Sequence, residues 1–256
     1  MLGGGIETDT AEGSSAALIA GVGISEKTWL SGSIAKSSLE LSNRQGLDSR
    51  FADIELDHHF DPVGIRVGAA YWGDPDVLES DDLRASLYFR NERLMLSADY
   101  EFRDFNFIIP SVDFLTRREF MFDADGIGVT ARFQPSENTS LRIRGIKYDY
   151  SVPFRAIDSV DAARLLSVSR LSLINSLVDN RASVLLGVDK GDRRWEIDFS
   201  SWEGAIMRSR TNSITLRYLM PLTDKTDIEF GLGYDDSELY GGVTFLSLYL
   251  YFYGGN

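Results

Sequence analysis

Strict alternation of polar and apolar residues is the feature that most constrains the fold of this chain. In the stretch TDIEFGLGYDD, residues 226–236, apolar side chains occupy every second position, and the positions between them carry charge or glycine. Successive side chains of a β-strand point to opposite faces, so this pattern predicts a strand with one apolar and one polar face. Whether the apolar face contacts a protein core or lipid decides the class of protein.

The same alternation recurs along nearly the whole chain and predicts about fourteen strands. Most of them approach the roughly 9–11 residues that a tilted strand needs to cross a bilayer. The predicted strands are 3–10, 15–25, 28–41, 50–60, 63–73, 82–90, 93–104, 119–133, 139–150, 181–190, 193–203, 209–220, 226–236 and 240–253. In 139–150 the alternation changes phase, which predicts a β-bulge near Gly145. We therefore expect an all-β fold, with residues 1–256 forming a single domain.

The connections between these strands alternate between short and long. Tight polar turns follow every second strand, at 25–27, 61–62, 91–92, 135–138, 190–192 and 221–225. The other connections include much longer segments, at 42–49, 73–82, 104–117 and 151–180. Short turns at one end and long loops at the other are typical of transmembrane β-barrels, which predicts an antiparallel up-and-down barrel of about 14 strands.

Aromatic residues are predicted to gather at both ends of the apolar face. Amphipathic aromatic side chains are favoured at lipid–water interfaces, so two girdles of aromatic residues indicate that one bilayer surrounds the apolar band between them. The expected turn-side and loop-side aromatics are Trp29, Phe60, Phe89, Phe133 and Trp195, and Tyr71, Phe102, Tyr150 and Tyr234.

Composition narrows the function. The chain has 39 Asp plus Glu against 26 Lys plus Arg, and this acidic balance argues against a nucleic-acid partner. There is no cysteine, which excludes disulfides and cysteine-ligated metal sites. No stretch of about 20 apolar residues reads as a transmembrane helix. Mean hydropathy is −0.14, a value that a soluble protein and a membrane barrel can share.

The segment 151–180 interrupts the alternation. Asp158 is a candidate helix N-cap, and a partial helical stripe follows it, so we expect a helix over about 158–178. At 1.5 Å per residue such a helix would measure about 30 Å, close to the length of a barrel. We expect it to fold over or into the pore mouth, where Asp158, Arg164 and Arg170 are candidate gate residues. An additional strand at 164–173 is the alternative.

With these patterns, the chain resembles bacterial outer-membrane β-barrel proteins as a class. Its last strand, LSLYLYFYGGN, is similar to their terminal strands, with Leu246, Leu248, Leu250 and Phe252 on one face. It departs from them in the trailing GGN, because the aromatic residue is not the last one. The resemblance implies a Gram-negative outer-membrane location, contact with membrane lipid and lipopolysaccharide, and turns on the periplasmic side.

The charged residues that alternate with the apolar ones along the strands make up the candidate site. Charges avoid dry protein unless they are paired, so this many inward charges imply a water-filled lumen or a paired network that blocks it. About fourteen strands enclose more space than side chains fill, which favours an open lumen. The expected lining residues are Arg66, Arg84, Arg93, Asp99, Glu101, Arg103, Arg132, Arg142, Arg144, Arg194, Glu196, Asp198, Arg217, Asp227 and Glu229. The same alternation predicts further inward charged residues, among them Asp149.

These features favour a porin-like channel or export conduit for hydrophilic solutes, without enzymatic activity, cofactor or metal. One alternative is the translocation domain of a larger polysaccharide or protein export machine with periplasmic components. Another is a membrane-embedded hydrolase, although His58 and His59 are adjacent on a strand and point to opposite faces. A soluble β-sheet binding protein is the remaining alternative.

Overall fold

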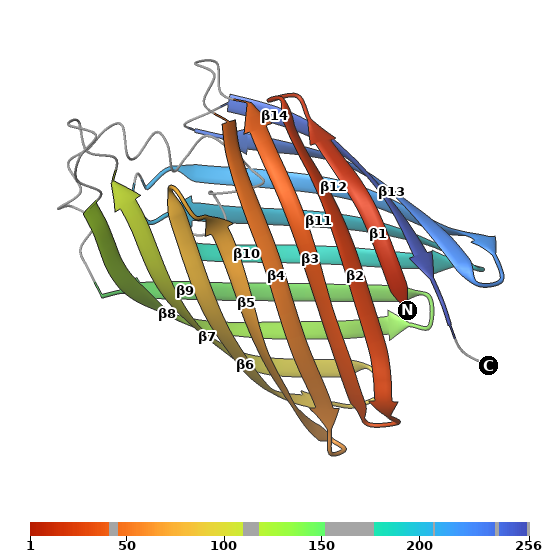
Figure 1. Cartoon of the computed structure of the whole chain (residues 1–256). Helices are drawn as coiled ribbons and strands as arrows, with labels where there is room; N and C mark the ends of the chain where they lie inside the picture. Colours follow the sequence, from red (N-terminus) through yellow and green to blue (C-terminus); the bar gives the residue numbers. More distant parts are fainter. Residues whose placement is uncertain (41–45, 110–117, 152–176, 207, 239–240, 255–256) are drawn as a thin grey trace.

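The protein is an antiparallel β-barrel of fourteen strands in the computed structural model, which describes residues 1–40, 46–109, 118–151, 177–206, 208–238 and 241–254 (Figure 1). The strands are β1 (Leu2–Asp9), β2 (Gly13–Ser25), β3 (Thr28–Glu40), β4 (Gly46–His59), β5 (Val63–Asp74), β6 (Leu78–Arg90), β7 (Leu94–Ile109), β8 (Arg118–Ser136), β9 (Thr139–Tyr150), β10 (Val178–Lys190), β11 (Arg193–Gly204), β12 (Arg210–Thr223), β13 (Thr226–Ser237) and β14 (Gly241–Phe252).

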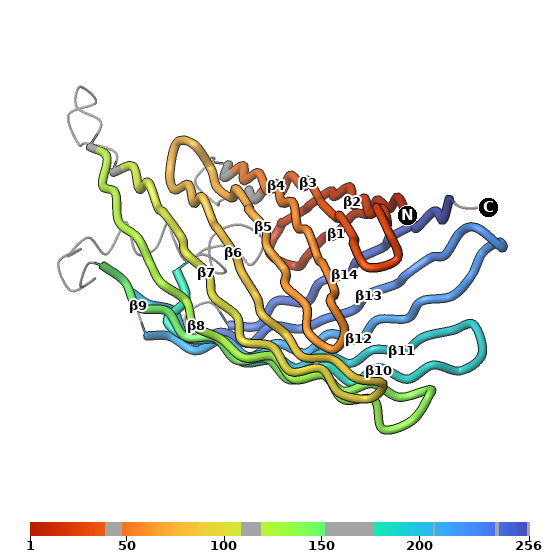
Figure 2. The backbone as a smooth tube through the Cα atoms, turned by 90° about the horizontal axis from the view of Figure 1, so that it is seen from below, coloured from red at the N-terminus to blue at the C-terminus, as the bar shows by residue number. Residues whose placement is uncertain are grey.

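Each strand pairs with its neighbours in sequence, and β1 pairs with β14 to close the barrel. In the closing pair Leu2 lies opposite Phe252 and Asp9 lies opposite Phe245. Figure 2 shows both termini at the same end of the barrel. The six turns at the end with the termini contain two or three residues each. The predicted up-and-down topology, the strand count and the position of the short turns are confirmed.

Several strands are longer than the alternation predicted. β6 begins at Leu78 rather than at 82, so the expected long connection 73–82 is the tight turn 75–77. β7 continues to Ile109 and β8 starts at Arg118. The predicted strands ended where charged residues appear at the otherwise apolar positions. Backbone pairing continues beyond the apolar band, because the hydrogen bonds between strands do not require a lipid-facing side chain.

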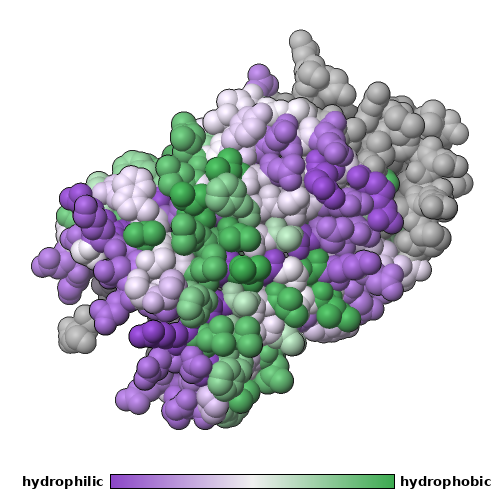
Figure 3. Space-filling view, turned by 180° about the vertical axis from the view of Figure 1, so that it is seen from behind, coloured by the Kyte–Doolittle hydropathy of each residue, from purple (hydrophilic) through white to green (hydrophobic). Residues whose placement is uncertain are grey.

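The apolar face of the strands lies on the outside of the barrel. Exposed apolar side chains occur on strands all around it. Among them are Ile6, Leu83, Ile127 and Leu232, which are between 49% and 72% exposed. Figure 3 shows the resulting hydrophobic band between two hydrophilic ends. A soluble β-sheet protein would bury these side chains against each other, so the soluble alternative is wrong.

The band has the height of a membrane core. On β7 the outward positions are apolar from Leu94 to Phe102, and Asp104 is the next residue on that face. Nine residues at about 3.3 Å each span roughly 30 Å along the strand. A strand tilt of about 35–45° reduces this to about 21–25 Å, close to the apolar band of outer-membrane barrels.

The predicted bulge near Gly145 is wrong. β9 pairs with β8 and β10 in unbroken register across this residue. The phase of hydrophobicity changes because the inner face itself becomes apolar: Ile146 and Tyr148 are buried on the inner side, whereas Ile143 is exposed on the outer side. Asp149, expected inside, therefore shares the outer face with Ile143.

Two of the expected interface aromatics lie on the inner face instead. Trp29 pairs with Asp57, which faces inward, and its ring lies against Gly21. Tyr150 stacks on Phe105 inside the barrel, with ring centroids 6.2 Å apart. Trp195, Phe89 and others remain on the outer face.

Residues 158–176 of the expected helix over 158–178 lie outside the described residues. Its expected end is wrong, because Val178 is the first residue of β10. The candidate gate residues Asp158, Arg164 and Arg170 also lie outside the described residues. Among the residues that are described, no helix is long and apolar enough to span a membrane.

Aromatic rings on the inner face repeatedly lie against glycines of the neighbouring strand. A Cβ at any of these glycines would come too close to the ring, so only glycine leaves room for it. The pairs are Gly3 with Tyr251, Gly5 with Tyr249, Gly21 with Trp29, Gly64 with Tyr88, Gly126 with Tyr148 and Gly233 with Phe245. We call these the glycine–aromatic pairs; they hold the rings flat along the barrel wall.

Candidate pore interior

The inner face of β4–β6 carries a group of ion pairs. The Nη2 of Arg66 lies 2.9 Å from the Oδ2 of Asp57, and its Nε lies 3.2 Å from the Oε1 of Glu55. The Nη2 of Arg84 lies 3.2 Å from the Oδ2 of Asp53. The hydroxyl of Tyr88 donates a hydrogen bond to Asp57. Residues from three adjacent strands meet here because all of them have the same inward parity in register.

Glu101 on β7 is the centre of a second group. Its carboxylate accepts hydrogen bonds from Arg103 at 3.1 Å, from Arg144 at 2.7 Å and from the Tyr148 hydroxyl at 2.5 Å. The guanidinium of Arg103 lies over the Tyr148 ring, 4.6 Å from its centroid. Glu101 is only 5% exposed. A buried carboxylate requires partners of this kind, since leaving it unpaired is costly.

A third group lies on β10–β12. Arg194 contacts Asp189 on β10 at 2.9 Å and Glu196 at 2.7 Å. Arg217 on β12 contacts the second oxygen of Glu196 at 3.4 Å. Cross-strand pairing of opposite charges stabilises neighbouring strands, by about 0.2–1 kcal/mol for each pair.

The predicted lining residues divide according to their contacts. Eight of them belong to ion pairs: Arg66, Arg84, Glu101, Arg103, Arg144, Arg194, Glu196 and Arg217. Asp99 accepts hydrogen bonds from Ser97 and Thr130. Within the described part of the chain, no ion pair includes the remaining six: Arg93, Arg132, Arg142, Asp198, Asp227 and Glu229. That these residues line a conducting lumen stays a prediction.

A polar cavity of about 510 Å³ lies on the inner side of β4–β9. Seven arginines and five carboxylates line it, from Glu55 on β4 to Arg144 on β9. Most of the first ion-pair group lines it, together with Glu101 and Arg144 of the second. A polar solute in this cavity would meet charges of both signs.

The loop end of the interior is apolar, which the sequence reading missed. Phe105, Phe122 and Trp202 are buried there with Leu78, and the Phe105 and Phe122 rings stack at 4.9 Å. Arg181 lies over the Trp202 ring at 5.5 Å. The alternation along β7 could have revealed this cluster, because Phe105 and Phe107 lie on the same inward face as Glu101 and Arg103.

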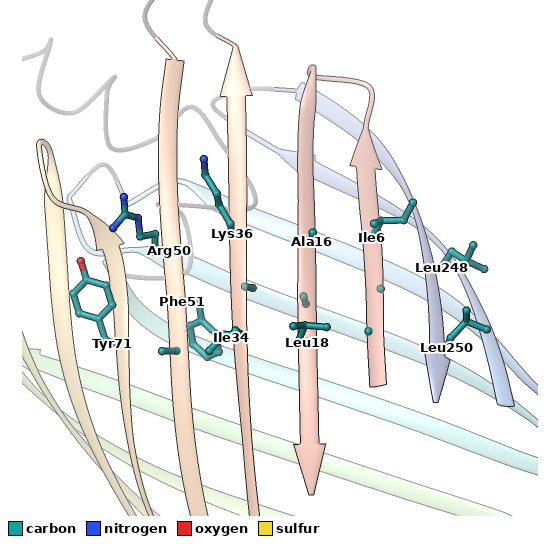
Figure 4. A pocket seen from close by; sticks show the side chains of 15 residues that line it. Ile6, Ala16, Leu18, Ile34, Lys36, Arg50, Phe51, Tyr71, Leu248 and Leu250 are labelled. Carbon is teal, nitrogen blue, oxygen red and sulfur yellow. The ribbon is translucent and has the colours of Figure 1, made fainter. Parts of the chain in front are cut away.

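The outer wall contains a groove of about 830 Å³ over β1–β4 (Figure 4). Small residues such as Gly4 and Ala16 form its floor, and the exposed side chains of Ile6, Leu18 and Ile34 line it. These side chains belong to the apolar face, so the groove faces lipid and is not part of the interior. In a bilayer it would hold hydrocarbon chains.

The fold and the inner charges define the class: the protein is a β-barrel of the bacterial outer-membrane type. No protein-family model matches the chain, and no curated protein matches it. The CymD monoaromatic hydrocarbon channel is similar in structure, with a TM-score of 0.57 and 9% identity over 99% of this chain and 88% of that one. The KdgM porin (TM-score 0.52, 7% identity, 99% of both chains) is similar too.

A third similar structure is OmpT of Vibrio cholerae, an outer membrane protein solved without its loop L8 (TM-score 0.53, 9% identity, 99% of this chain and 98% of that one). At such low identity these likenesses show a shared fold. They span nearly the whole of this chain, so the barrel as a whole is of the kind that outer-membrane channels use.

Proposed function

We propose that the protein is an outer-membrane channel that lets hydrophilic solutes diffuse through a charged, water-filled lumen. The observation that carries this proposal is the inversion of the fold: apolar side chains cover the outside, while charged side chains lie inside. The likeness to solved porins and channels supports the same role. We further propose that membrane lipid and lipopolysaccharide surround the barrel wall.

The charges inside the barrel are distributed unevenly. Arginines predominate on β6–β9, whereas Asp227 and Glu229 lie on β13, across the barrel in strand order. Both acids are close to the turn end of β13, as Arg132 is on β8. Opposed charges across a narrow aqueous path orient dipolar solutes and reject apolar ones. Selectivity by charge and dipole is therefore the expected mechanism.

The other readings receive no specific support from the described residues. His58 contacts the Thr28 hydroxyl at 2.7 Å, and His59 lies 3.9 Å from Asp61, so neither histidine forms a Ser–His–Asp arrangement. In the same residues no group of three or more His, Cys, Asp or Glu side chains could hold a metal ion. Participation in an export machine and gating by Asp158, Arg164 and Arg170 stay predictions.

Conductance of the purified, refolded protein in planar bilayers tests the channel. We expect discrete current steps in KCl, and uptake of neutral sugars into proteoliposomes measured by swelling. Protein denatured before addition is the control. Refolded barrels that insert, shown by heat-modifiable migration, and yet neither conduct nor admit sugars would contradict the proposal.

A further inference from the structure

Two arginines occupy directly paired positions inside the barrel. Arg132 on β8 lies opposite Arg142 on β9 in the register of the sheet, and both side chains are exposed within the interior cavity. Like charges placed directly opposite one another destabilise a strand pair. A bound anion would offset this repulsion.

Neither arginine has a partner among the described residues: no ion pair, hydrogen bond or aromatic ring contact includes Arg132 or Arg142. This sets them apart from Arg66, Arg84 and Arg144 in the same cavity, each of which contacts a carboxylate. Their guanidinium groups are free to bind a solute.

Four of the five carboxylates that line the cavity are engaged, and outside it Glu196 and Asp198 on β11 lie close enough to Arg142 to attract it. Glu55 and Asp57 contact Arg66, and Glu101 binds two arginines and Tyr148. Asp99 on β7 accepts hydrogen bonds from Ser97 and from Thr130 of β8. With seven arginines against five carboxylates, the cavity has an excess of positive charge.

We propose that Arg132 and Arg142 form an oxyanion subsite, which binds the carboxylate of anionic solutes such as acidic sugars as they cross the barrel. A guanidinium presents parallel N–H donors that match the two oxygens of a carboxylate, and such charged hydrogen bonds are about twice as strong as neutral ones. Two arginines side by side can hold both oxygens or two successive carboxylates. The inference rests on the proposed channel and names its substrate class.

Equilibrium dialysis of refolded protein in zwitterionic detergent tests the subsite without requiring conduction. The probes are glucuronate and, as the neutral comparison, glucose. We expect saturable glucuronate binding that weakens as salt increases, and no binding of glucose. The variant with both Arg132→Gln and Arg142→Gln should bind glucuronate at least about tenfold more weakly. Heat-modifiable migration verifies that the variant folds.

Arg193→Gln is the control, because it removes one positive charge at the start of β11, outside the cavity. It should leave glucuronate binding unchanged. Equal glucuronate binding by the wild type and the double variant, or equal binding of glucose and glucuronate, would overturn the subsite. Bilayer conductance separates the two proposals: a barrel that binds glucuronate without conducting contradicts the channel and keeps the subsite.

Discussion

Tyr148 lies flat against Gly126 of the neighbouring strand, so that a Cβ at Gly126 would come within 2.6 Å of the tyrosine ring. The ring cannot simply move aside, because it is buried and its hydroxyl donates a hydrogen bond to Glu101. Packing on the inner wall and the central charge group are therefore coupled through one side chain.

We expect Gly126→Ala to destabilise the barrel by about 1–3 kcal/mol, since the added methyl group displaces a packed ring. Urea unfolding from lipid vesicles, followed by tryptophan fluorescence, measures the change. Gly145→Ala is the matched control, because a Cβ there meets nothing within 4 Å. Equal stability of the two variants would show that Tyr148 moves freely.

A cation on the outer face should be costly only within the apolar band. Val129 is 65% exposed within the band on β8. Val129→Arg is expected to lower the free energy of unfolding by about 2–4 kcal/mol in vesicles, the cost of arginine near the membrane midplane. The control is Met121→Arg on the same face, beyond Asp123 and Asp125, with a much smaller effect. If both variants were equally stable, the band would not face lipid.

The apolar cluster at the loop end of the interior should behave like the core of a soluble protein. Phe105 is 1% exposed and stacks on Phe122. Phe105→Ala should therefore cost about 3–5 kcal/mol. Phe199→Ala, at an outward position that is 51% exposed, removes the same group from the lipid face. In parallel unfolding experiments, a larger loss for Phe199→Ala would contradict an interior core.

Removal of the Glu101 charge should leave a buried cation with much less compensation. Arg103 has only 15% of its side chain exposed and contacts both Glu101 and Asp82. We expect Glu101→Gln to cost about 3–5 kcal/mol, as measured when one partner of a buried ion pair is removed. Glu92→Gln changes the same charge at an exposed turn and should be nearly neutral. Comparable stability of the two variants would show that water already screens Arg103.

The sequence was sufficient to predict all fourteen strands, because alternation is a local property that each strand carries by itself. The outward position of the apolar face also followed, since charges at the other parity needed water or partners. Bounds were less accurate where strands leave the membrane, as at Leu78 and Ile109, because the outer face there is polar.

The contacts inside the barrel could not be predicted from the sequence. Arg144 on β9 meets Glu101 on β7, across the intervening strand β8, only because register and barrel curvature bring them together, and neither is encoded locally. Gly145 was misread for a related reason: β9 changes from a polar to an apolar inner face, which imitates a change of phase in a strand that has no bulge.

The glycine–aromatic pairs affect the bore of the barrel. Each ring lies over the backbone of its glycine. The aromatic side chains therefore thicken the wall and project little toward the barrel axis. A larger residue in place of one glycine would push the aromatic ring toward the barrel axis and narrow the interior locally. The six paired glycines therefore help determine the width of the barrel interior.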